Sequence, residues 1–436
     1  MSRRTWQRPN NGKAQALRYD WGRMDIAGWL TGRRLRAQGL VLALALWSIY
    51  SWVIATPGLR DRNGNLKGTD FLHFYTLGSL AIAHRGEALY DMSAQAVLAS
   101  QRVPAAAGIR YLPLYPPQVS VLFAPFARFS YPTALALWAV ISGLIYAACC
   151  YGVWRVCSRL SGYRGTLALL AAAFPSFFHL IAWGQTSALA LACFTVAFLC
   201  FRKRHEFVAG IALGLLIFKP QLALAGVILF LSLGSWRMIA GAIASSAIEM
   251  AAGVLYYGLA PLVAWFQTIW HVRQVGYALE PRPYQTHSLR TFWSMLIPWN
   301  SISLALYVIS AIVVLAWTIQ VWKRSQSWEL RFSILLLATV LVSPHLTVYD
   351  LVILAPALLL LANWLLSQTE MRRWPKIGVL LYLVYILPLV GFLTRWTHMQ
   401  LSVLAMTALA YEIWRVVRSD DVLRCAVGAN VRSVQV

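Results

Sequence analysis

The chain has 436 residues, of which 59% are apolar and only 12% charged, and its mean hydropathy is +0.60. This composition excludes collagen-like, disordered and disulfide-scaffold proteins and is typical of an integral membrane protein. Lys and Arg number 38 against 15 Asp and Glu, a net charge of +23. Because the basic residues form short clusters between apolar runs, we expect cytoplasmic loops and contacts with anionic lipid, with no nucleic-acid partner.

Apolar runs of about 20 residues, the length that crosses a bilayer, recur along the chain. They predict an all-α, polytopic membrane protein of about twelve transmembrane helices. The approximate spans are 39–55, 114–129, 133–154, 166–183, 185–201, 207–232, 237–258, 300–321, 330–343, 349–367, 377–396 and 400–417. The count falls to ten or eleven if the 114–129 run or the 174–185 stretch is re-entrant.

The first span follows a 38-residue basic segment, which is too long for the n-region of a signal peptide. We therefore expect an uncleaved span and a cytoplasmic tail at 1–38, then a membrane domain at 39–417 and a cytoplasmic tail at 418–436. This orientation places the long polar segments 56–113 and 259–299 on the outer face. Strict alternation of the spans also puts Arg155 and the basic cluster at 202–204 outside, in conflict with the positive-inside rule.

Carboxylates are few, and most lie in tails or at expected cytoplasmic helix ends, so those near the outer face are the main candidates for proton transfer. Asp70 opens the stretch 70–91, whose apolar residues are spaced three and four apart. That spacing predicts a short amphipathic helix lying at the outer membrane interface. Asp70 either caps this helix or serves as a base, and the two roles are compatible. His73 follows one turn later.

Three further features place polar chemistry in apolar surroundings. The run Ser343 to Asp350 lies at a break between two spans, where it is either functional or a proline-kinked turn capped by Asp350. Lys219 lies within an expected span, where an unpaired ammonium costs about 2.5 kcal/mol or more. We therefore expect it to face a cavity, Glu249 or an anionic ligand such as a lipid phosphate. Arg290 in the outer segment is suited to a phosphate or to lipid headgroups.

Six segments in order resemble those of glycosyltransferase family 87, multi-span enzymes of the GT-C superfamily. They are DFLHFYTLGSLAIAHRGEALYD, YLPLYPPQVSVLFAPFA, GQTSALAL, AGIALGLLIFKPQ, THSLRTFW and SPHLTVYDL, between about residues 70 and 360. The resemblance implies an inverting hexosyltransferase that uses a polyprenyl-phosphate sugar, typically mannose. It also implies a glycolipid or polysaccharide acceptor on the outer side of the inner (plasma) membrane.

The resemblance also implies roles for individual residues. Asp70 matches the family's proposed general base, and His345 and Asp350 compete for a second catalytic role, because the later motif departs from the common SPxSWxHH form. Lys219 and Arg290 are suited to stabilising the departing lipid phosphate. The residues expected to bind substrate are His73, Tyr75, Tyr115, Gln185, Lys219, Arg290 and Tyr349.

The sequence has no glycine-rich nucleotide loop and no DxD pattern. We therefore expect no required cofactor and no metal ligands, while a divalent cation at the donor phosphate stays open. The alternative function is a flippase for lipid-linked sugars or a polysaccharide exporter, which twelve spans and an embedded lysine would also suit. The long outer segment that begins with Asp70 favours the enzyme, because transport does not require it.

Overall fold

The computed structural model describes residues 31–271, 282–368 and 375–433, with the backbone alone at 375 and 420–433. The regular secondary structure of these ranges is helical, and the β pairing in them is limited to two isolated bridges, Arg60–Leu66 and Thr286–Thr347, so the all-α class is confirmed. The tail at 1–30 lies outside the described residues. The α-helices are α2 (Gly32–Ile54), α3 (Thr69–Ile82), α4 (Met92–Arg102), α5 (Gln118–Phe123), α6 (Tyr131–Val156), α7 (Arg164–Ala172), α8 (Pro175–Trp183), α9 (Ser187–Arg202), α10 (Glu206–Gly214), α11 (Leu224–Ser232), α12 (Trp236–Tyr257), α13 (Ala260–His271), α15 (Leu289–Leu296), α16 (Asn300–Arg324), α17 (Trp328–Val342), α18 (Ala355–Ser367), α19 (Pro375–Ile386), α20 (Thr394–Thr397) and α21 (Leu401–Ser433). The 3₁₀ helices are η1 (Gly86–Tyr90), η2 (Pro104–Ala106), η3 (Phe126–Arg128), η4 (Ser158–Tyr163), η5 (Leu215–Phe218), η6 (Pro220–Leu222), η8 (Pro283–Gln285), η9 (Asp350–Leu354) and η11 (Leu387–Leu393).

Within the described ranges, six helices are long and apolar enough to cross a membrane. They are α2, α6, α12, α16, the η9–α18 unit and the unit from α19 to α20. A seventh is formed if Ser158–Ala172, which comprises η4 and α7, and α8, bent by 46° at the break between them, count as one broken span. The protein is therefore polytopic, but twelve full-length spans are not confirmed. Several expected spans are shorter helices, among them α9 and α17.

The expected span at 114–129 is wrong. Residues 109–116 have no regular secondary structure, and α5 that follows has six residues, about 9 Å of helix, far short of a bilayer. Prolines at 113, 116, 117 and 125 explain the difference, because they remove backbone donors and limit helix to short pieces. Hydropathy alone could not separate this apolar segment from a crossing helix.

The expected span at 207–232 is also two helices that run in opposite directions. Gly210 of α10 lies against Met238 of α12, and Gly214 lies against Ala242, so α10 and α12 are parallel neighbours. The chain between them must therefore return, and α11 makes that return. Lys219 lies at the turn, between η5 and η6, and not in the interior of a helix.

Small residues let α10 and α12 approach closely, as in GxxxG pairs of membrane helices. A Cβ on Gly214 would lie 2.1 Å from Oγ of Ser245 and 2.2 Å from the carbonyl oxygen of Ala242. We expect Gly214→Ala to lower the unfolding free energy by about 1–3 kcal/mol through overpacking, although alanine favours helices. Thermal unfolding in detergent measures the change. Gly143→Ala in α6 is the control, because a Cβ there meets nothing within 4 Å.

The helix that carries Asp70 is not the expected interfacial helix. All residues of α3 from 71 to 81 are buried, so the helix has no face to lay on a membrane surface. Gly78 lies against the backbone of Phe123 in α5, where a Cβ would come within 2.4 Å of the carbonyl oxygen. The apolar spacing in the sequence was read correctly as helix, but its polar positions are covered by neighbouring helices and not by water.

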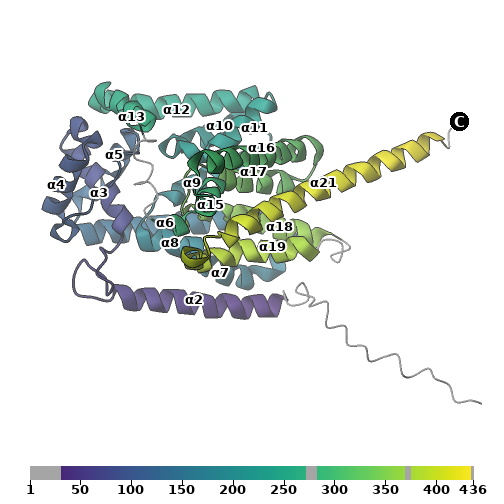
Figure 1. Ribbon diagram of the computed structural model, residues 1–436, viewed down its shortest axis with the longest axis horizontal. Helices are drawn as coiled ribbons and strands as arrows, with labels where there is room; N and C mark the ends of the chain where they lie inside the picture. The colour runs from purple at the N-terminus through teal and green to yellow at the C-terminus, as the bar shows by residue number, and fades with distance from the viewer. Residues whose placement is uncertain (1–30, 272–281, 369–374, 434–436) are drawn as a thin grey trace, which may run out of the picture.

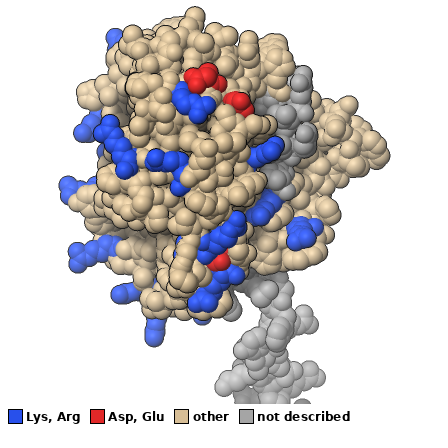
Figure 2. Space-filling view, turned by 90° about the vertical axis from the view of Figure 1, so that its left-hand side faces the viewer, with Lys and Arg blue, Asp and Glu red and all other residues tan. Residues whose placement is uncertain are grey.

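Most of the helices in segments 56–113 and 259–299 gather at one end of the bundle. In Figure 1, α3, α4, α5 and α13 lie on the left, while α21 leaves the bundle on the right, and α2 and α12 run along opposite edges. Figure 2 looks onto the left-hand end and shows Lys and Arg side chains spread across it, with Asp and Glu in few places. Exposed basic residues near α3, α4 and α5 include Arg60, Arg62, Arg85, Arg102, Arg110 and Arg128.

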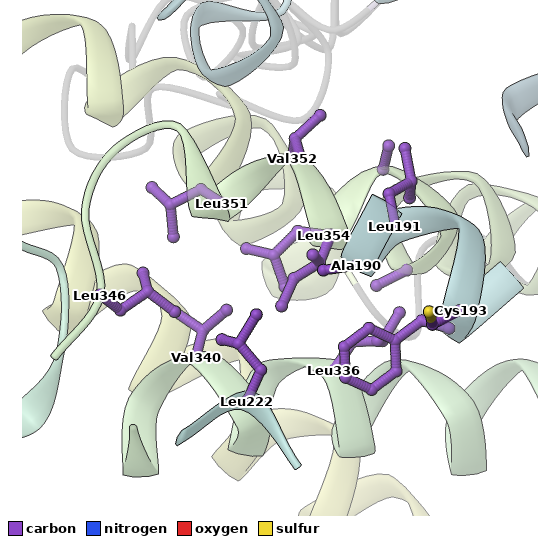
Figure 3. Packing of buried hydrophobic residues seen from close by; sticks show 14 of the residues in the cluster. Ala190, Leu191, Cys193, Leu222, Leu336, Val340, Leu346, Leu351, Val352 and Leu354 are labelled. Carbon is purple, nitrogen blue, oxygen red and sulfur yellow. The ribbon is translucent and has the colours of Figure 1, made fainter. Parts of the chain in front are cut away.

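A continuous apolar core joins α9, α17 and η9. Figure 3 shows Leu191 of α9, Val340 of α17 and Leu354 of η9 among its side chains, and all three are buried. Leu222 of η6 reaches the same cluster. The core therefore fixes, relative to one another, the start of α9, the turn that carries Lys219 and the start of η9.

Candidate functional site

Asp70 is the second residue of α3, and its side chain does not cap that helix. The cap position is Gly68, whose φ of +64° is left-handed and which makes no side-chain cap bond. The Asp70 carboxylate instead accepts a 2.7 Å hydrogen bond at Oδ2 from Nε2 of Gln185. Asp70 is partly exposed, whereas Gln185 is buried.

Gln185 lies between α8 and α9. The preceding Gly184 has a φ of +71°, and a Cβ on it would lie 2.6 Å from Cβ of Phe71, so glycine permits this loop to approach α3 beside Asp70. The indole Nε1 of Trp138 donates to the carbonyl oxygens of Gly184 and Gln185, at 3.1 and 3.2 Å. The backbone that presents Gln185 to Asp70 is therefore anchored to α6.

Lys219 and Asp350 form a buried ion pair, with Nζ 2.7 Å from Oδ1 and side chains about 5% exposed. The hydroxyl of Ser187 donates to the same Oδ1 at 2.5 Å and accepts from Nζ at 3.1 Å. Nζ also lies 3.5 Å from Oε1 of Gln185. These contacts join Asp70, Gln185, Ser187, Lys219 and Asp350 into one set of bonded side chains, called here the polar network.

The turn that presents Asp350 is held from two sides. Its Oδ2 accepts from the backbone N–H and the hydroxyl of Thr347, at 3.3 and 3.2 Å. The turn also pairs with the outer segment, because the N–H of His287 donates to Leu346 and the N–H of Val348 donates to Gln285. The segments predicted as separate outer motifs therefore meet at this turn.

The electrostatic surroundings suit Asp70 to proton transfer. Burial raises the pKa of Asp70 to about 6, against the lowering effect of the Gln185 hydrogen bond. The charges of Lys219 and Arg282 also lower this pKa, and that of Asp350 raises it. At neutral pH the carboxylate is mostly ionised, yet it is a stronger base than an exposed aspartate.

His73 and two tyrosines line the side of Asp70 that faces α4 and α5. The His73 ring lies 5.0 Å from that of Tyr111 and 5.6 Å from that of Tyr115, measured between centroids. His73 is 4% exposed, and its two ring nitrogens lack partners among the described residues. Burial lowers its pKa to about 3, so the imidazole is neutral. Tyr111 donates from its hydroxyl to the carbonyl oxygen of Thr69.

The structure brings some of the predicted residues into or against the network and places others elsewhere. The Tyr349 ring lies 5.3 Å from Nζ of Lys219. Arg290 donates to the carbonyl oxygen of Pro344, beside the turn that presents Asp350. Tyr75 bonds to Phe129 and Arg102 in a separate cluster.

Of the two residues competing for a second catalytic role, Asp350 is in the network, and the carbonyl oxygen of His345 accepts from the hydroxyl of Ser343. Glu249, one of the three alternatives considered for Lys219, is not its partner, because Lys219 pairs with Asp350 and Glu249 accepts from Gln118.

Two members of the site escaped the sequence reasoning. Ser187 joins Lys219 to Asp350, and Thr347 holds the far oxygen of Asp350. Serine and threonine are too common in apolar helices to indicate a site by themselves. The available signal was position, since Ser187 follows Gln185 by two residues and Thr347 precedes Asp350 by three.

Comparison with known proteins agrees with the resemblance. The family model described as glycosyltransferase family 87 matches residues 114–344, a little over half of the chain. The matched range contains Gln185, Ser187 and Lys219, and it is flanked by Asp70 and Asp350. No curated protein and no solved structure matches the chain.

Proposed function

Because the chain belongs to glycosyltransferase family 87, we propose that it transfers a hexosyl group, with mannose as the expected sugar, from a polyprenyl-phosphate donor. The acceptor is a glycolipid or polysaccharide at the outer face of the inner membrane. One observation carries the proposal: a partly exposed carboxylate, Asp70, is held by Gln185 at the edge of a buried network of fixed charges. That arrangement supplies a base in one geometry, which transfer to a hydroxyl requires.

In the proposed reaction Asp70 takes the proton from the acceptor hydroxyl as its oxygen attacks the anomeric carbon. The new bond joins that oxygen to the anomeric carbon, and the bond from this carbon to the phosphate oxygen breaks. The electron pair of the broken bond leaves with the polyprenyl phosphate. A single displacement inverts the anomeric configuration. The phosphate is a competent leaving group, so the protein contributes mainly position, a base and charge.

The contacts of Lys219 favour a structural role in the polar network rather than direct binding of the phosphate. An ammonium has three N–H donors, and Nζ of Lys219 has three partners, in Asp350, Ser187 and Gln185. We therefore assign the departing phosphate to the guanidinium groups at the outer segment, Arg290 and Arg282. The basic end of the bundle in Figure 2 would draw an anionic donor toward them.

The helix arrangement supports an outward-facing site. If α5 does not cross the membrane, α6 runs from the outer side to the cytoplasmic side. Arg155, near the end of α6, and the 202–204 cluster, at the end of α9, then fall on the cytoplasmic side, in agreement with the positive-inside rule. With α10 and α11 as a returning pair, α12 runs outward again. Asp70, Gln185, Lys219 and Asp350 then share the outer side. Labelling of single introduced cysteines in intact cells tests this arrangement at exposed Arg110 and at Arg202.

The direct test is transfer from polyprenyl-phosphate mannose carrying a radiolabelled sugar. Membranes with the protein should place the label in a glycolipid or polysaccharide fraction, and membranes without it should not. Movement of the intact donor across vesicles without any new glycosidic bond would favour the flippase or exporter. The reaction as proposed requires no cofactor, and EDTA in the assay checks whether a divalent cation assists at the donor phosphate.

The pKa of Asp70 sets the expected pH dependence. A base must be deprotonated, so kcat/KM should be constant above about pH 7 and fall about tenfold per unit below pH 6. An exposed aspartate would keep nearly full activity to about pH 5. Initial rates between pH 4.5 and 8, with the protein shown to stay folded, measure the profile. A rate that is unchanged at pH 5 would contradict the assignment.

A further inference from the structure

Gln185 contacts the carboxylate of Asp70 but is itself 6% exposed, whereas Asp70 is partly exposed. The Gln185 side chain is therefore less accessible to a substrate than Asp70 is. Among the described residues, the one side-chain hydrogen bond to Asp70 is the bond from Nε2 of Gln185 to Oδ2. Oδ1 is therefore the oxygen left for an acceptor hydroxyl.

The orientation of the Gln185 amide is determined by its partners. Oε1 lies 3.3 Å from the backbone N–H of Thr186 and 3.5 Å from Nζ of Lys219, and both of these groups can only donate. The amide oxygen must face them, so the NH₂ group must face Asp70, whose carboxylate can only accept. Trp138 holds the backbone of the same residue. The main chain of Gln185 and its side-chain amide oxygen are therefore both held by hydrogen bonds.

We infer that Gln185 is a positioning residue for the general base: its amide, held by Lys219 and the Thr186 N–H, binds Oδ2 of Asp70 and directs Oδ1 to the acceptor. This inference rests on the proposed function. Through Lys219, the amide also ties the position of Asp70 to Asp350, which lies in the segment SPHLTVYDL. Gln185 itself need not touch donor or acceptor.

Other charged and titratable groups around Asp70 come from several elements. Those with an electrostatic effect on Asp70, or affected by it, are Lys219, Asp350, Arg282, Tyr111, Tyr115, Tyr131 and Tyr349. None of these bonds to the carboxylate in the described structure, so the Gln185 amide is the contact whose removal changes its hydrogen bonding directly. A hydrogen bond to the ionised form lowers a carboxyl pKa, so its loss raises that pKa.

The experiment compares pH profiles of kcat/KM for Gln185→Leu and Gln185→Glu, using membranes and polyprenyl-phosphate mannose. For Gln185→Leu we expect the acid limb to move up by about one pH unit, since hydrogen bonds to charged groups contribute on this scale. At pH 6 the rate should then fall about fivefold from protonation alone. Gln185→Glu places a carboxylate oxygen against Oδ2 and should move the limb in the same direction. KM for the donor should stay unchanged at high pH.

Thr195→Val is the matched control, because it alters a buried polar side chain of α9 outside the network and should keep the wild-type profile. A folded Gln185→Leu protein with a wild-type acid limb overturns the inference, as does a higher donor KM at every pH. If Gln185→Leu does not fold, the isosteric Gln185→Glu gives the same readout. If Asp70→Asn is inactive but Gln185→Leu keeps the wild-type pH profile, only the inference about Gln185 is contradicted. If Asp70→Asn is fully active, the assignment of Asp70 as the base is contradicted as well.

Discussion

Asp70→Asn is expected to lower kcat/KM for sugar transfer by about 10²–10⁴-fold, the range usual for loss of a general base. Asparagine has the shape of aspartate and can still accept the bond from Nε2 of Gln185, so the fold should be retained. The loss would then come from the missing proton acceptor. The measurement is the initial rate of mannose transfer in membranes that contain equal amounts of the two proteins.

Glu87→Gln is the control for this prediction. Glu87 is an exposed acid of the same outer segment, and its side chain pairs only with Arg85 at 3.4 Å among the described residues. Its removal changes the charge of the outer end by the same amount without touching the network, and the rate should remain at the wild-type level. Equal losses in the two variants would mean that charge alone, and not the base, explains the effect.

The second large effect concerns the Lys219–Asp350 pair. Lys219→Met leaves the Asp350 carboxylate buried without its counter-ion, which typically costs about 3–5 kcal/mol of folding free energy. Asp350→Leu should cost a similar amount by stranding the ammonium. The double variant should recover much of the stability, because an apolar pair replaces both charges. Denaturant unfolding in detergent, arranged as a double-mutant cycle, measures the coupling.

The same cycle separates stability from activity. The double variant should fold but stay impaired in transfer, since Oε1 of Gln185 loses its contact with Lys219. The exposed Arg85–Glu87 pair provides the comparison, because ion pairs on the surface contribute little. If Lys219→Met were as stable as the wild type, the pair would not be a structural charge pair, and Lys219 would be available to bind phosphate.

The sequence indicated the rare charges of the site but not their partners. Asp70, Lys219 and Asp350 stood out because ionisable residues in apolar surroundings are costly. The pairing of Lys219 with Asp350 across 131 residues is tertiary, and Glu249, nearer in sequence, was an equally reasonable partner before the fold was known. Gln185 was found through its motif, yet its bond to Asp70 depends on the approach of Gly184 to Phe71.

The sequence predicted the positions of helices better than it predicted which of them cross the membrane. Most long apolar runs do form helix, but composition does not show where a chain turns back. Prolines shortened the 114–129 segment, and the close packing of Gly210 and Gly214 on α12 set the direction of α10. The outer helix α3 was placed at a membrane surface because its pattern has polar positions, such as His73 and Thr76, that neighbouring helices cover instead.

The polar network also bears on when the protein becomes active. Asp70 and Gln185 are 115 residues apart in the chain, and Asp350 must be present before Lys219 has its counter-ion. A ribosome-bound chain that ends before residue 350 therefore exposes an unpaired lysine and an unsupported base. Such a nascent chain should be inert toward donor lipid, so the timing of the first catalytic turnover is set by completion of synthesis.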